Sequence, residues 1–113
     1  MKTSIWGPPL WIFLHSISFN YPSTPTKQQQ NQMIIFFNGL KDILPCRFCR
    51  ESYSIYLSKH PIKNHVSSKK TLSKWVYNLH NCVNDKLRKQ GNFIEKNPTY
   101  TNIKKKYQKN NVS

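Results

Sequence analysis

Apolar residues recur every three or four positions along most of the chain, which is the spacing of one face of an α-helix. No segment alternates between apolar and polar residues for long, and no Asn-Gly or Asp-Gly pair lies between two apolar runs as in a β-hairpin. The pair Asn38-Gly39 falls inside an apolar stripe, where it weakens or bends a helix. The pattern therefore predicts an all-α fold.

Two helices are expected before Pro45. Pro8 and Pro9 suit the first turn of a helix, because backbone N–H groups there have no helical partner. The apolar stripe of this helix ends at the segment 21–25, and it consists of Leu10, Trp11, Phe13, Leu14 and Ile17. A second helix is expected over residues 26–44, with a stripe of Met33, Ile34, Phe36, Phe37, Leu40, Ile43 and Leu44.

A third helix is expected to open at Pro45 with Cys46 in its first turn. It ends at His60, because a residue that precedes a proline, here Pro61, is disfavoured in the α region. Its buried face carries Tyr53, Tyr56 and Leu57. The polar and basic residues 62–70 are expected to form a loop.

A fourth helix is expected to begin after a cap at Ser67 or Ser68 and to stop at Gly91. Its apolar stripe consists of Leu72, Trp75, Leu79, Val83 and Leu87. A short fifth helix starts at Asn97-Pro98 and runs through Tyr107. These elements predict a four-helix bundle with a short fifth helix.

The length of 113 residues suits one domain with a modest core, so residues 1–113 are expected to form a single domain. A basic C-terminal tail begins at about residue 104. No apolar run is long enough to cross a bilayer, and Gly7-Pro8-Pro9 interrupts the apolar stretch that a signal peptide needs. We therefore expect a cytoplasmic protein that is not secreted.

Lys and Arg total 18 against 4 Asp and Glu, a formal charge of +14. A composition rich in Lys, Asn and Ile, as in AT-rich genomes, accounts for this excess, because the charge is spread along the chain. A nucleic acid or an acidic protein surface is the alternative explanation. Nucleic acid is not favoured, since no recognition motif for it is evident.

Three cysteines are present, of which Cys46 and Cys49 form a C-x-x-C pair and Cys82 stands alone. A pair at the N-terminus of a helix predicts redox chemistry, because the helix dipole and the free N–H groups favour a thiolate. Arg47 and Arg50 add positive charge beside it. Cys82 is expected to be a small apolar residue without a catalytic role.

A zinc-binding module that contacts nucleic acid is the main alternative, with Cys46, Cys49, His60 and His65 as ligands. The gap between the second cysteine and the first histidine is about two residues shorter than in a usual finger. Pro61 also ends the helix at His60, whereas a finger needs both histidines on one helix. A third hypothesis is a basic interaction module in which the cysteines are incidental.

Two pairs of residues lie four positions apart, and each pair shares one helical face: Trp11 with His15, and His80 with Asn84. With the C-x-x-C pair and the run H-N-x-V-N-x-x-L-x-K over residues 80–89, they resemble the ERV/ALR family of FAD-linked sulfhydryl oxidases. The resemblance extends over most of the chain.

The resemblance implies an FAD-dependent thiol oxidase that holds FAD within the bundle. It implies that Cys49 lies nearest the flavin and donates electrons to it, and that Cys46 faces the substrate. Oxygen would accept the electrons and form hydrogen peroxide. The resemblance also implies FAD contacts from Gly7, Trp11, His15, His80, Asn81, Asn84, Lys89 and Tyr100.

Two features of many family members are missing. A second disulfide joins the C-x-x-C helix to the next helix in those members, whereas this chain has Tyr77 at one of its positions. A shuttle cysteine pair in a tail is also absent. The resemblance therefore implies direct oxidation of a separate thiol-containing protein, for example a thioredoxin-like one, as in short members from large DNA viruses. The site of action would then be the host cytoplasm or the virion.

A homodimer is also expected, as in the family, without a disulfide between the chains. A chain this short buries little surface by itself. The apolar surface of the first two helices exceeds what one small bundle needs, and it consists of Trp6, Trp11, Ile34, Phe36 and Phe37.

Overall fold

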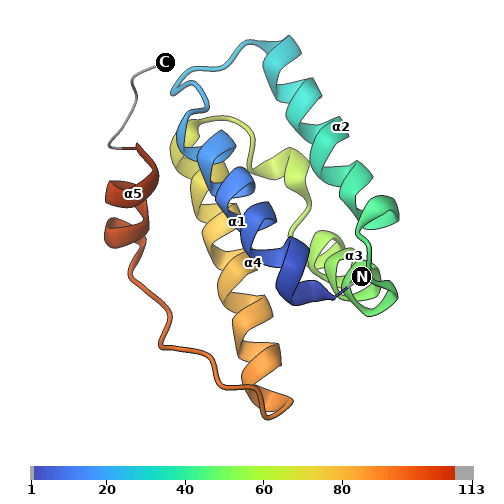
Figure 1. The fold of residues 1–113 in the computed structure, drawn as a ribbon. Coiled ribbons are helices and arrows are strands. Elements are labelled where there is room, and N and C mark those ends of the chain that lie inside the picture. The colour runs from blue at the N-terminus through green and yellow to red at the C-terminus, as the bar shows by residue number, and fades with distance from the viewer. Residues whose placement is uncertain (1, 109–113) are drawn as a thin grey trace.

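A computed structural model describes residues 2–108, and within this range all regular structure is helical, as the sequence predicts. The elements are α1 (Thr3–Phe19), α2 (Lys27–Ile43), α3 (Arg47–Lys59), the 3₁₀ turn η1 (Ile62–Asn64), α4 (Lys69–Lys89) and α5 (Tyr100–Gln108). Figure 1 shows α1 and α4 side by side, with α5 on one side of this pair and α2 on the other. The remainder of the predicted basic tail, residues 109–113, lies outside the described residues.

The starts of α2 and α4 are fixed by side chains that bond to the free N–H groups of the first turn. The Thr26 hydroxyl accepts from the Gln29 N–H at 3.1 Å, and the Gln29 amide oxygen accepts from the Thr26 N–H at 2.9 Å. Ser68 and Thr71 form the same reciprocal arrangement at α4. Gly91, with φ +87°, follows the end of α4 in the left-handed region that glycine tolerates best. These caps confirm the predicted bounds.

The start of α1 differs from the prediction. The helix begins at Thr3, so Pro8 and Pro9 lie inside it rather than in its first turn. The extension buries part of Trp6 against the core, and this packing outweighs the two backbone hydrogen bonds that the prolines remove. The predicted loop 62–70 also differs, because it contains η1 and buries Ile62 in the core.

Trp75 of α4 forms the centre of the core and is 2% exposed. Its ring makes edge contacts with Phe37 of α2 at 5.2 Å and with Tyr56 of α3 at 5.4 Å, measured between ring centroids. Its indole N–H donates to the His60 carbonyl at 2.9 Å. Tyr53 of α3 donates to the carbonyl of Phe37. The orientation of α3 against α2 and α4 is therefore set by packing together with hydrogen bonds.

The extended segment between α4 and α5 is attached to α4 by polar contacts. Arg88 donates to the Ile94 carbonyl at 3.4 Å and to the Asn97 side chain at 2.8 Å. The Tyr77 hydroxyl donates to the Pro98 carbonyl at 2.6 Å. These bonds direct the chain back along α4, so that α5 packs against both α1 and α4.

Candidate functional site

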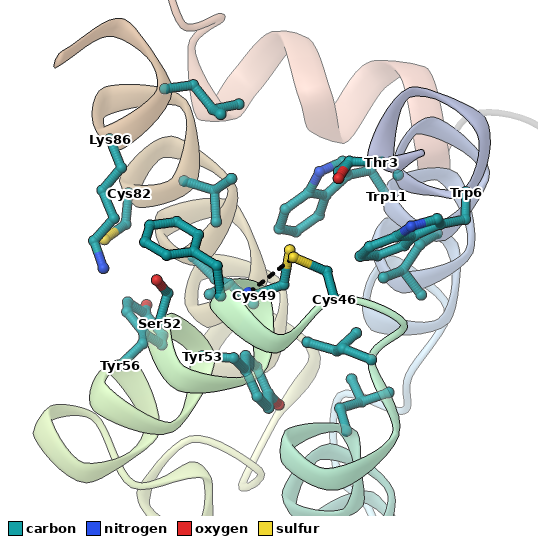
Figure 2. Close-up of a pocket in the computed structure, with 18 of the residues that line it drawn as sticks. Thr3, Trp6, Trp11, Cys46, Cys49, Ser52, Tyr53, Tyr56, Cys82 and Lys86 are labelled. Carbon is teal, nitrogen blue, oxygen red and sulfur yellow. Dashed lines mark hydrogen bonds between the residues drawn. The ribbon is translucent and has the colours of Figure 1, made fainter. Parts of the chain in front are cut away.

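Cys46 and Cys49 lie at the N-terminus of α3, in the connection from α2. Cys46 is the N-cap of α3 and not a residue of its first turn, which corrects the prediction. Its sulfur accepts a hydrogen bond from the Cys49 N–H at 3.2 Å (Figure 2). A sulfur at an N-cap takes the place that a Ser or Asp oxygen usually fills, next to the positive end of the helix dipole.

The two thiols have opposite electrostatic environments. The pKa of Cys46 is lowered by a hydrogen bond from the Cys49 side chain, and further by the backbone N–H groups of Cys49 and Phe48 and the charge of Arg50. The pKa of Cys49 is raised to about 11, first by burial and then by the neighbouring Cys46. Arg47 is paired with Glu51 instead. In the reduced pair the thiolate therefore resides on Cys46.

An apolar cavity of about 280 Å³ opens beside the pair, and we name it the Cys49 cavity. Figure 2 shows Cys46 and Cys49 at its centre, between side chains of α1 on one side and of α4 on the other. The wall from α1 includes Trp6, Gly7, Leu10, Trp11 and Leu14. The wall from α4 includes Leu79, Cys82, Val83, Lys86 and Leu87. The cavity can hold a flat, mainly apolar ring system in contact with a sulfur atom.

An aromatic cluster joins α1, α4 and α5 next to this cavity. The rings of Trp11 and His80 stack at 4.0 Å with an angle of 9° between their planes. His15 Nε2 lies 2.9 Å from His80 Nδ1, and Tyr107 stacks on His15 at 5.0 Å. The expected pair Trp11 and His15 therefore lies in this cluster, and the expected pair His80 and Asn84 contributes His80 to it.

The two histidines of the cluster are neutral at pH 7. Burial lowers the pKa of His15 to about 4, and the charges of His80 and Lys106 contribute further. Burial, followed by the charge of Lys106, lowers the pKa of His80 to about 4 as well. Since both rings are neutral, one donates and the other accepts in their shared hydrogen bond.

Two buried nitrogen atoms at this site have no hydrogen-bond partner within residues 2–108. They are Nε1 of Trp6 and Nδ1 of His15. Buried polar groups without a partner are rare in folded proteins. Trp6 lines the Cys49 cavity, whereas His15 belongs to the aromatic cluster next to it.

The other predicted site residues are separated from this cluster. The Asn84 side chain donates to Asn97, and Tyr100 shares a hydrogen bond of 2.7 Å with Ser73. Asn81 and Lys89 line a second depression between α3 and α4, which we name the outer groove. Adjacent helical residues point about 100° apart, so Asn81 cannot share the face of His80.

Lys106 and Tyr107 belong to the cluster, although the sequence interpretation did not select them. Tyr107 is the last residue of the predicted fifth helix, and its place in that helix was the only sequence signal. Its contact with His15 depends on the path of the chain between α4 and α5, which no local pattern specifies.

The described part of the chain contains no zinc site of the kind that the alternative hypothesis requires. No three His, Cys, Asp or Glu side chains of residues 2–108 lie close enough together to hold a metal ion. His60 and His65 line the outer groove, whereas Cys46 and Cys49 line the other cavity.

No described helix has the length and apolar character needed to span a membrane.

Comparison with known sequences gives a consistent result. A sequence profile of the Erv1 / Alr family matches residues 8–108. A probable FAD-linked sulfhydryl oxidase of Acanthamoeba polyphaga mimivirus is 38% identical over 85 residues, covering 74% of this chain and 59% of that protein. The mitochondrial FAD-linked sulfhydryl oxidase ERV1 of Saccharomyces cerevisiae is 38% identical over 93 residues, covering 80% and 48%. The chain thus spans about half the length of these relatives.

Comparison with solved structures extends the similarity to the fold. The FAD binding domain of Erv1 from Saccharomyces cerevisiae superposes with a TM-score of 0.85 at 29% identity, covering 96% of each chain. The yeast Erv1 core gives a TM-score of 0.84 at 28% identity, covering 97% of this chain and 86% of that one. The helical arrangement is therefore similar over nearly the whole chain.

The difference between the two thiols predicts selective alkylation. When the reduced protein is treated with iodoacetamide at neutral pH, Cys46 should react well before Cys49, because only the thiolate is nucleophilic. The rate at Cys46 should fall only when the pH drops below its lowered pKa. Peptide mass spectrometry after quenching measures both sites. Faster modification of Cys49 would contradict the assignment.

The neutral histidines predict a loss of stability in mild acid. Below about pH 6.5 the unfolded chain protonates both imidazoles, whereas the folded chain does so only near pH 4. Stability is therefore complete above pH 6.5 and falls between pH 6.5 and 4, by up to about 1.4 kcal/mol per pH unit for each imidazole. Urea denaturation from pH 4 to 8 measures this slope, and His80→Gln should reduce it. An NMR titration with either imidazole near 6.5 would contradict the expectation.

Proposed function

Because this chain belongs to the Erv1/Alr family, we propose that it is an FAD-dependent thiol oxidase that forms disulfides in a substrate protein. The observation that carries the proposal is the Cys46–Cys49 pair at the wall of an apolar cavity. The pKa of Cys46 is lowered and that of Cys49 is raised. Residues 1–113 would form one domain with this activity. Bound FAD would accept two electrons from the reduced cysteine pair and pass them to oxygen, giving hydrogen peroxide.

The residues present fit an FAD molecule. A cavity of about 280 Å³ suits a flavin ring system and is too small for the whole dinucleotide. An added Cβ at Gly7 would meet only the Thr3 side chain, at 3.6 Å, which is an ordinary van der Waals distance. The protein itself therefore does not require a glycine here, and the absence of a side chain leaves space at the cavity wall. The nitrogens of Trp6 and His15 are buried without a partner, so they could bond to polar edges of the ligand only after a side-chain movement.

The remaining FAD contacts follow from the chemistry of the aromatic cluster. We propose that Trp11, His15 and His80 contact a second ring system, which would have to open the present stacking of Trp11 on His80 and of Tyr107 on His15. Lys106 lowers the pKa of both histidines and is thus close enough to attract a negatively charged group such as a pyrophosphate. We further propose contacts from Asn81, Asn84, Lys89 and Tyr100, which would require side-chain movements in this part of the fold.

The two cysteines would have separate tasks. Cys46 is partly exposed and carries the thiolate, so it would exchange with the substrate. Cys49 is more deeply buried and would contact the flavin. The substrate would be a separate thiol-containing protein, with thioredoxin-like proteins as candidates. The viral relatives support a site of action in the cytoplasm of an infected cell or in a virion.

A homodimer formed by α1 and α2 is part of the proposal. Phe37 is 0% exposed and belongs to the core, so its predicted place at the interface is wrong. Other apolar side chains of the two helices are half or more exposed, and they are Ile5, Ile12, Phe13, Ile35 and Ile43. A surface of this kind on a soluble monomer would favour self-association.

Separate serine variants test the proposed roles of the cysteines. Cys46→Ser and Cys49→Ser should each abolish oxidation of dithiothreitol, measured as oxygen uptake, while FAD stays bound. Only Cys46→Ser should show a broad long-wavelength absorption band, the signature of a thiolate beside an oxidised flavin. This band should grow with rising pH, because burial raises the pKa of Cys49.

The control is Cys82→Ala, which removes the third thiol and should keep most of the activity. A purified protein that is colourless and takes up no added FAD would overturn the proposed function. A band in Cys49→Ser and none in Cys46→Ser would reverse the two roles.

The dimer is tested by light scattering with and without reductant. We expect a dimer in both conditions, since the proposed interface contains no cysteine. Phe13→Glu with Ile35→Glu should dissociate it, because each places a charge in the apolar surface. Phe93→Glu is the matched control, since Phe93 is 92% exposed and lies outside α1 and α2. A monomer at micromolar concentration, or a dimer lost only in reductant, would contradict the proposal.

A further inference from the structure

The outer groove is a second large depression, with a volume of about 730 Å³, between α3 and α4. Its apolar floor includes Ile55, which is 51% exposed, and the edges of Tyr56 and Trp75. Neither Cys46 nor Cys49 lines it. The groove is large enough for a short stretch of extended polypeptide.

The rim of the outer groove is strongly basic. Lys59, Lys74, Lys86 and Lys89 all line it. Asp85 is the one carboxylate among its lining residues, and Arg88 already pairs with it at 2.8 Å. The lysines therefore have no carboxylate partner within the groove, and their charges act together on whatever enters it.

The outer groove is continuous with the Cys49 cavity. Ser52, Tyr56, Cys82 and Lys86 line both of them. Figure 2 shows these four side chains together on one side of the cavity, opposite Trp6 and Trp11. A chain segment that lies in the groove is thus held beside α3, the helix that begins at the redox pair.

We propose that the outer groove is the docking site for an acidic segment of the protein that the redox pair oxidises. The proposal rests on the proposed thiol oxidase function. Carboxylates of the segment pair with the lysines of the rim, and its apolar side chains contact Ile55. Docking raises the effective concentration of the substrate cysteines at Cys46.

The floor of the groove favours a peptide over a nucleic acid. Single-stranded nucleic acids bind through exposed aromatic rings on which bases stack. Here Tyr56 is 8% exposed and Trp75 is 2% exposed, so neither ring offers a free face. The exposed ring of His60 already packs against Tyr56 at 4.7 Å between ring centroids. A floor whose exposed apolar side chain is Ile55, with a basic rim, matches a segment of mixed carboxylate and apolar side chains.

The first experiment compares two dithiol peptides with the holoenzyme. They share a C-x-x-C core and differ in a flank that holds either four glutamates or four glutamines. The kcat/KM for the acidic peptide should exceed that for the neutral one by about tenfold at low ionic strength, and the difference should shrink with added salt. Equal values at low salt would overturn the proposal.

A charge-reversed variant localises the effect. Lys59→Glu with Lys74→Glu should remove the preference for the acidic peptide and leave oxidation of dithiothreitol unchanged. The matched control is Lys27→Glu with Lys41→Glu, which reverses two exposed lysines on α2, outside the groove, and lowers the net charge equally. If both double variants lose the preference alike, the effect is that of net charge and the proposal fails.

A binding measurement separates docking from catalysis. A fluorescent acidic peptide with serines in place of its cysteines should bind the unsubstituted protein, and the Lys59/Lys74 variant should bind it at least about fivefold more weakly. This result would stand even if the protein oxidised no thiol, so failure of the proposed function remains distinguishable. Tighter binding of an oligonucleotide of equal charge, lost in the same variant, would overturn the peptide assignment.

Discussion

The indole of Trp75 lies where three helices meet, and the position of the redox pair depends on it. Phe37 of α2 and Tyr56 of α3 pack against its ring, while its N–H donates to the carbonyl of His60, which follows α3. α3 is short and begins with the cysteines, so any tilt of α3 moves them relative to α4. Burial of one tryptophan and one hydrogen bond therefore determine that Cys49 lies beside the α4 wall of the cavity. Loss of such a side chain typically costs about 3–5 kcal/mol, a large part of the stability of a small domain.

The segment that leads to α5 is held without a covalent link. Tyr77 donates to the carbonyl of Pro98, and Arg88 bonds to several groups of the same segment, including Asn97. A hydrogen bond to a charged group contributes about 1.5–3 kcal/mol when shielded, and less here because Arg88 is 30% exposed. Several such bonds together fix the path of the chain from α4 to α5.

Local chemistry explains which parts of the fold the sequence predicted. Thr26, Ser68 and Gly91 act within one turn of the chain, so the helix ends that they define were confirmed. Phe37 was assigned to an exposed face because an apolar stripe does not reveal which of its residues meets the core. Tyr107 was missed for a related reason, since its contact with His15 requires the whole segment after α4 to fold back. Tertiary packing decides which apolar residues are buried and which distant residues meet, so a short stretch of sequence is not enough to predict them.

In the proposed oxidase, the different environments of the two cysteines would link thiol exchange to occupancy of the cavity. When a substrate thiolate attacks the sulfur of Cys46 in the oxidised pair, Cys49 must leave as an anion. Leaving is faster for a thiol of low pKa, yet burial raises the pKa of Cys49. The protein alone therefore makes the first step unfavourable, although it presents Cys46 to the substrate. A ligand that stabilises negative charge on Cys49 would remove this barrier, so exchange should be slow until the cavity is filled. The same burial would protect an empty protein from reacting with thiols that it cannot finally oxidise.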